Sequence, residues 1–137
     1  MQLPITGLNV NVTRNPANRN QLIIGMLQAQ WGGEVGSQFH GNWPPDVPTA
    51  PARFDKDERI TKVLVLHRDY TWARNETAPH WIAGMQVHTN KNFYDFGDTD
   101  GRADVCSPLA GEQIIGFYGR GGSYLDQLGC LYSKAQK

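Results

Sequence analysis

Short runs in which apolar and polar side chains alternate recur along this chain. Residues 5–12 read ITGLNVNV, and their near-alternation predicts a half-buried strand. Residues 21–31 are less regular, and we favour a strand over a short helix because the run stops at a Gly-Gly breaker. Residues 60–66 carry apolar side chains on both faces, which is typical of a core strand covered on both sides.

The C-terminal half of the chain predicts two hairpins. Residues 81–89 and 93–96 are apolar segments joined by a polar turn. Residues 113–118 and 124–132 are joined by the glycine-rich turn GRGG. The chain is therefore expected to be all-β, as a sandwich, a barrel or a prism of short strands.

Composition agrees with this pattern. The 137 residues include 15 glycines and 8 prolines, which indicates many tight turns, and the length suits a single domain over residues 1–137. Four of the prolines lie within residues 41–51. Because proline lacks a backbone donor and has a fixed φ, we expect this segment to be a surface connection inside the domain.

Charge and hydropathy limit the partners. Lys plus Arg and Asp plus Glu both number 13, so no long-range field attracts nucleic acid or an anionic membrane. No segment approaches the roughly 18 apolar residues of a membrane span, and the first residues lack the pattern of a secretory signal. We expect no nucleic-acid partner and no membrane insertion, in a chain that is either cytosolic or cut from a longer secreted precursor.

Two cysteines, Cys106 and Cys130, allow at most one internal disulfide. A bridge requires Cα atoms roughly 4.4 to 6.8 Å apart, and the sequence alone leaves both the bridged and the free state open.

Metal, cofactor and enzyme chemistry lack a local signature. The four histidines are too far apart for a zinc motif, and no phosphate-binding lysine follows the glycine-rich turns. No terminal Glu completes a calcium loop, and no carboxylate pair is marked for acid/base work. We expect no metal, no cofactor and no enzyme activity. The acidic residues that partly resemble a calcium loop are Asp95, Asp98, Asp100 and Asp104.

The glycine-rich turn and the residues after it are suited to binding a polar ligand. Glycines 119, 121 and 122 leave backbone N–H groups accessible, because no Cβ blocks the approach. The Asp126 carboxylate can accept two hydrogen bonds from neighbouring hydroxyls, and Tyr124 offers an aromatic face to a sugar ring. An Asp after a turn also commonly bonds its own backbone, so the residues alone leave a purely structural role open.

Four segments, in order along the chain, resemble the jacalin-related lectins. Residues 114–129, IIGFYGRGGSYLDQLG, resemble the GF-x-G-R-x-G hairpin of that family and its G-x-x-x-D sugar loop. Residues 57–63 resemble a mid-domain strand, and residues 82–91, IAGMQVHTNK, resemble the I-x-G-L-x-F-x-T-N-K hairpin. Residues 28–36 match an early strand more loosely, so that the resemblance covers roughly residues 5 to 132.

The resemblance implies a β-prism of three antiparallel four-stranded sheets with the sugar at one end. It implies that Asp126 accepts from two hexose hydroxyls, that the backbone N–H groups of Ser123 and Tyr124 donate, and that Gly122 gives clearance. The glycine-rich first strand of the family is missing or replaced here, since residues from Ile5 align with the strand after it. The implied sugar-binding loop comprises Gly122, Ser123, Tyr124, Leu125 and Asp126.

A second loop, residues 68–80, corresponds to the one that lines the other side of the sugar in this family. Its Tyr70 and Trp72 are expected either to stack on a second sugar residue or to cap the core. The cleaved N-terminus of some galactose-preferring members has no counterpart, which favours a mannose-type ligand.

Two hypotheses of different classes follow. The first is a lectin that binds mannose-type sugars or complex N-glycans, in a secreted location, as a homo-oligomer or as a domain of a larger secreted protein. The second is a lectin-fold module that binds proteins or itself without sugar affinity.

Overall fold

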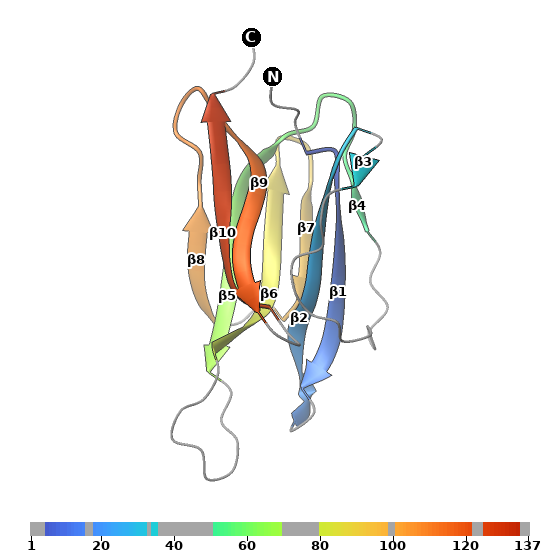
Figure 1. Ribbon diagram of the computed structural model, residues 1–137, viewed down its shortest axis with the longest axis vertical. Helices are drawn as coiled ribbons and strands as arrows, with labels where there is room; N and C mark the ends of the chain where they lie inside the picture. Colours follow the sequence, from blue (N-terminus) through green and yellow to red (C-terminus); the bar gives the residue numbers. More distant parts are fainter. Residues whose placement is uncertain are drawn as a thin grey trace.

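The computed structural model describes residues 5–15, 18–32, 34–35, 51–69, 80–98, 101–121 and 125–134. These residues form ten strands and no helix, and therefore no helix that could cross a membrane (Figure 1). Every strand pair is antiparallel. The strands are β1 (Gly7–Asn15), β2 (Asn18–Trp31), β3 (Glu34–Val35), β4 (Ala52–Arg53), β5 (Ile60–Asp69), β6 (His80–Thr89), β7 (Phe93–Gly97), β8 (Arg102–Cys106), β9 (Glu112–Gly121) and β10 (Leu125–Lys134).

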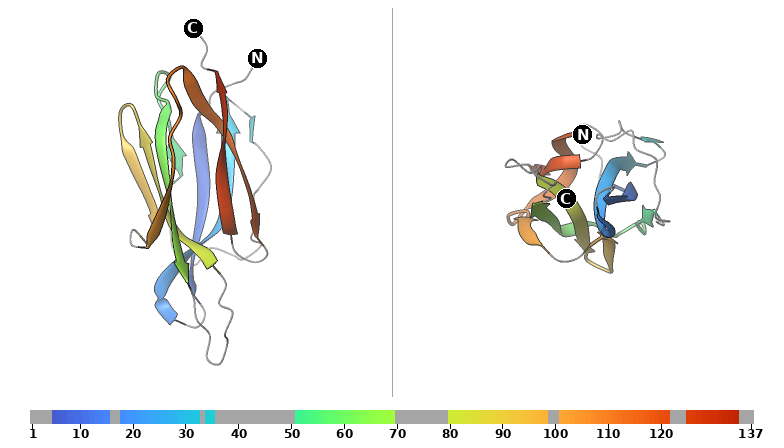
Figure 2. Two further views of the ribbon diagram at one scale, coloured as in Figure 1. Left: turned by 90° about the vertical axis from the view of Figure 1, so that its left-hand side faces the viewer. Right: turned by 90° about the horizontal axis from the view of Figure 1, so that it is seen from below.

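Three sheets surround one core. Two have four strands, in the orders β3-β2-β1-β4 and β7-β6-β5-β8, and the third is the hairpin β10-β9. Seen along the strands, the three are arranged around a common centre (Figure 2). The predicted all-β prism of three antiparallel sheets is confirmed. Its third sheet has two strands in the part of the chain described.

The core is filled by the inward faces of these sheets. In β1, Leu8, Val10 and Val12 point inward as the alternation predicts, and all are buried. In β2 the pairing passes from Asn11↔Met26 to Val12↔Ile24 and leaves out one residue, which is a β-bulge. This extra residue explains the imperfect alternation of residues 21–31.

The central strand β5 carries apolar residues on both faces, as its sequence predicts. Val63 and Val65 are fully buried in the core, where they lie opposite Val87 and Met85 of β6. Leu66, which points to the other face, is also buried.

Strand β8 was not predicted from the sequence. It pairs with the edge of β5, from Val63↔Cys106 to His67↔Arg102, and four of its five residues are exposed. A short edge strand with charged residues on an exposed surface shows no apolar alternation, so its pairing is visible only in three dimensions.

A buried carboxylate joins the turn before β5 to the turn between β6 and β7. Glu58 is 1% exposed and accepts hydrogen bonds from the Thr89 hydroxyl, the Tyr94 hydroxyl at 3.0 Å and the Asp55 backbone N–H at 2.9 Å. The Asn92 amide is a fourth, longer donor at 3.4 Å. Burial raises the pKa of Glu58, but these hydrogen bonds together outweigh it and leave the pKa below its ordinary value. The ionised carboxylate therefore stabilises this end of the prism.

Replacing this carboxylate should destabilise the fold in a pH-dependent way. Because an amide cannot accept from all four donors, we expect Glu58→Gln to lower the free energy of unfolding by about 2 kcal/mol at neutral pH. A lowered folded-state pKa gives stability that is present above the unfolded-state pKa and lost as the pH falls through the folded-state value. The difference between variant and wild type should therefore shrink below about pH 4. Urea unfolding across this range measures it, and a loss equal at all pH values would contradict the role assigned to the charge.

Candidate functional site

Strand ends that flank the two predicted sugar-binding segments lie at the same end of the prism. The β9–β10 ladder ends there at Gly121↔Leu125, and the β5–β6 ladder ends there at Asp69↔His80. In Figure 1 both are at the lower end, opposite the turn that carries Glu58. The fold thus brings together two ladder ends that are far apart in the sequence.

The predicted site residues fall mainly outside the described part of the chain. Gly122, Ser123 and Tyr124, and likewise Tyr70 and Trp72, belong to segments that are not described. Leu125 and Asp126 are the first two residues of β10, where the backbone is described. The roles of these seven residues in binding sugar stay predictions.

The backbone around Asp126 has a distinctive register. Leu125 pairs with Gly121, and the next pair is Gln127↔Arg120, so Asp126 has no partner in β9 and forms a β-bulge. A bulge changes the direction of the strand and of its side chains, and such irregularities are common beside functional sites. Asp126, which the sequence indicates as a sugar-binding residue, is thus the bulged residue at the turn end of the hairpin.

A second bulge supports the other half of the hairpin. The ladder passes from Leu131↔Gly116 to Tyr132↔Ile114 and leaves Ile115 without a partner. The carbonyl of Ile115 accepts a hydrogen bond of 2.9 Å from the indole Nε1 of Trp31, the last residue of β2. This contact fastens the hairpin to the sheet β3-β2-β1-β4.

The inward face of the hairpin packs against the core. Ile114 and Phe117 of β9 and Cys130 of β10 are buried, and Leu128 packs against them. Across the core, β10 lies against β6 and β2, and β9 lies against β5.

The outward face carries an aromatic side chain over a glycine. Tyr118 pairs with Gly129, and a Cβ added to Gly129 would lie 2.4 Å from Cζ of the Tyr118 ring. The ring thus covers the backbone of β10, while 59% of Tyr118 stays exposed. This pairing was not predicted, because only the register shows which glycine lies opposite which ring.

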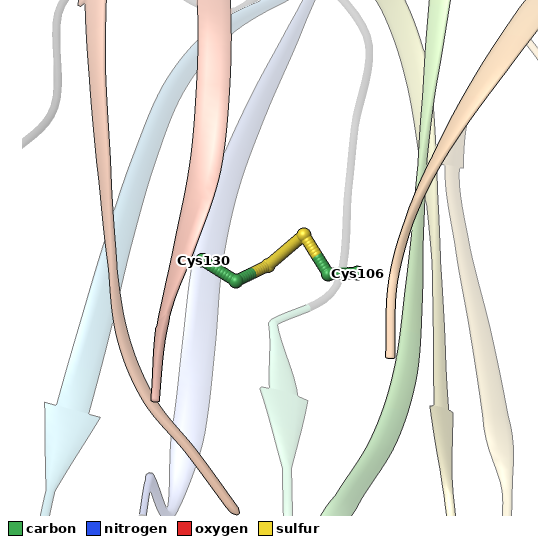
Figure 3. Close-up of a disulfide and its surroundings, with 2 residues drawn as sticks. All are labelled: Cys106 and Cys130. Carbon is green, nitrogen blue, oxygen red and sulfur yellow. A yellow bond between two sulfur atoms is a disulfide. The ribbon is translucent and has the colours of Figure 1, made fainter. Parts of the chain in front are cut away.

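A disulfide connects the hairpin to a four-stranded sheet. Cys130 in β10 is bonded to Cys106, the last residue of β8, with their Cα atoms 6.2 Å apart (Figure 3). The sequence left open whether these cysteines are bridged or free, and in the structure they form a disulfide.

No group of three potential metal ligands occurs among the described residues. Asp95 and Asp104 lie in strands β7 and β8, and Nε2 of His67 is 2.9 Å from an Asp104 carboxylate oxygen. Glu58 is the one buried carboxylate in this part of the chain, and it lies at the opposite end.

Comparison with known families gives a match over most of the chain. The model of the Jacalin-like lectin domain family matches residues 12–131. A curated mannose/glucose-specific lectin from Parkia pendula is 43% identical over 49 residues, which are 35% of this chain and 11% of that protein. The chain thus corresponds to about a tenth of the length of this relative.

Solved structures share the fold at low sequence identity. A prostate-specific WGA16 glycoprotein lectin superimposes with a TM-score of 0.72 at 17% identity, covering 98% of this chain and 86% of that one. The Calystegia sepium agglutinin gives a TM-score of 0.71 at 20% identity, covering 96% and 83% of the two chains. A mannose-binding jacalin-related lectin from Ananas comosus gives 0.69 at 21% identity, covering 98% and 85%. At this identity the likeness concerns the fold.

The hydrogen bond from Trp31 to Ile115 leads to a prediction about the stability of the hairpin. Trp31→Phe keeps an aromatic ring but removes the donor to Ile115, which leaves a partly buried carbonyl unpaired. We expect a loss of about 1 kcal/mol in unfolding free energy, with faster amide exchange in β9 and β10 than in β5 and β6. Hydrogen exchange with mass spectrometry measures this, and unchanged exchange in the hairpin would show that the indole is not an anchor.

Proposed function

The chain belongs to the Jacalin-like lectin domain family, and from that premise we propose that it binds hexoses through residues 122–126, without catalysing a reaction. The observation that carries the proposal is the bulge at Asp126, the second residue of β10, directly after the segment that connects this strand to β9. The sequence predicted that the turn begins at Gly119, but β9 extends to Gly121, so Gly119 and Gly121 lie in the strand. An ionised carboxylate accepts several hydrogen bonds at once, and charge-assisted bonds are stronger than neutral ones. This chemistry suits two neighbouring hydroxyls of a sugar ring.

The preferred ligand in this proposal is of the mannose type. The Ananas comosus lectin is described as mannose-binding, the Morus nigra lectin was solved with mannose, and the Parkia pendula lectin is mannose/glucose-specific. A Calystegia lectin was solved with a biantennary N-glycan, which extends the proposal to complex N-glycans.

A larger glycan would extend toward the segment between β5 and β6. The Asp69↔His80 end of the β5–β6 ladder lies at the same end of the prism as the turn end of the β9–β10 hairpin. We therefore place Tyr70 and Trp72 as candidates for stacking on a second sugar residue, which adds apolar contact that a single hexose lacks.

The proposal includes a secreted location and multivalent use. The Cys106–Cys130 disulfide suits an oxidising compartment, where such bonds persist. A single small polar ligand gains little over its hydration in water, so useful avidity requires several sites, in a homo-oligomer or in a larger secreted protein.

A second candidate function is a protein-interaction or self-association module without sugar affinity. It is favoured by the exposed Tyr118 and Leu131, which are 59% and 45% exposed on the outward face of a hairpin that pairs with no further strand in the described chain. A glycan array separates the two candidates, since only the lectin is retained by immobilised glycans.

Removing one carboxylate tests the lectin proposal. We expect Asp126→Ala to weaken binding of methyl α-mannopyranoside by about a hundredfold, since two charge-assisted hydrogen bonds are lost. Isothermal titration calorimetry measures the affinity, and thermal unfolding shows whether the fold is kept. The matched control is Asp95→Ala, which removes an exposed carboxylate of β7 and should leave the affinity unchanged. An Asp126→Ala variant that binds as tightly as the wild type would refute the site.

A further inference from the structure

The disulfide encloses the whole predicted sugar-binding hairpin in a covalent ring. Cys106 and Cys130 are 24 positions apart, and the chain between them contains all of β9, the connection to β10 and the first residues of β10, Asp126 included. We infer that this disulfide positions the hairpin for sugar binding, so that breaking it weakens hexose binding while the two four-stranded sheets stay folded. The inference rests on the proposed function of residues 122–126.

The hairpin needs such an anchor because it has little lateral support. The other two sheets have four strands each, whereas β9 and β10 pair only with one another in the part of the chain that is described. A two-stranded hairpin is at best marginally stable by itself in water. Its position must therefore come from contacts made across the core.

The disulfide attaches the hairpin to an edge strand that pairs with the buried part of β5. Cys106 pairs with Val63 of β5, and Val63 is fully buried between β6 and β8. At the other end of the bridge, Cys130 is buried opposite Phe117. Figure 3 shows the two side chains reaching toward one another from β10 and the end of β8.

The position of the bridge along the hairpin determines what it controls. The hydrogen bond from Trp31 to Ile115 holds the half of the hairpin that is farther from the predicted loop. Cys130 is closer to that loop and lies four residues after Asp126 on the same strand. Without the bridge, the contacts that the structure describes for the loop half are the apolar packing of Phe117 and Leu128. The half of the hairpin near the predicted loop should then separate from the core more often, while the half near Ile115 stays packed against it.

A hairpin that separates from the core part of the time lowers the apparent affinity for the sugar. The apparent dissociation constant equals the intrinsic constant divided by the fraction of molecules that are competent to bind. If breaking the bridge reduces that fraction to about one tenth, the affinity for a mannoside falls about tenfold.

The test compares a variant that lacks the disulfide with a variant of the polar cluster at the end of the prism away from the predicted loop. One is the double variant Cys106→Ala/Cys130→Ala, and the matched control is Glu58→Gln, which changes the far end and leaves the disulfide intact. Each is titrated with methyl α-mannopyranoside and followed by hydrogen exchange. We expect the double variant to bind about tenfold more weakly and to exchange faster in β9 and β10, with β5 and β6 still protected. We expect the control to bind like the wild type.

Several outcomes would overturn the inference. A folded double variant that binds like the wild type would do so, and so would an equal loss of protection in all three sheets. If the double variant does not fold, the oxidised wild type is titrated with dithiothreitol. Loss of protection in β9 and β10 before β5 and β6 supports the inference, and simultaneous loss overturns it.

The failure of the proposed function is recognised separately. A wild-type protein that binds neither the mannoside nor any glycan on an array contradicts the lectin proposal. The exchange comparison then still decides whether the disulfide holds the hairpin.

Discussion

The β9–β10 hairpin must be held in place by contacts perpendicular to its own plane. In a four-stranded sheet, the two inner strands are fixed by backbone hydrogen bonds on both sides, as β1 and β2 are in one sheet of this prism and β5 and β6 in the other. The hairpin has such bonds on one side of each strand only, within the chain described. Its position therefore depends on buried side chains such as Phe117, on the Trp31 indole and on the covalent bond to β8.

The two ends of the prism are built from different chemistry. At one end, the Glu58 carboxylate accepts hydrogen bonds from two turns and makes a closed polar cluster. At the other end lie the turn end of the β9–β10 hairpin and the Asp69↔His80 end of the β5–β6 ladder. The sugar site that we propose is therefore at the end of the prism away from the Glu58 cluster.

The sequence predicted the strands well wherever burial imposes a regular pattern of apolar side chains. Residues 5–12 nearly alternate, and residues 60–66 carry apolar side chains on both faces, because these side chains are buried, and both segments form strands. Strand β8 escaped prediction because Arg102 and Asp104 face solvent on an edge, so no period marks it. At the candidate site, the resemblance implied that Asp126 binds the sugar, and this role stays a prediction. Its bulge depends on the pairing between two strands, which no local pattern encodes.

The two bulges of the hairpin have opposite effects on its register. Asp126 is one extra residue in β10, and Ile115 is one extra residue in β9, so the pairs Leu125↔Gly121 and Lys134↔Glu112 at the two ends are in the same frame. A shift of one residue in a strand turns its inward side chains outward. Insertions and deletions within these strands are therefore tolerated only in compensating pairs. Within this hairpin, we therefore expect divergence in length to be confined to the segment between Gly121 and Leu125.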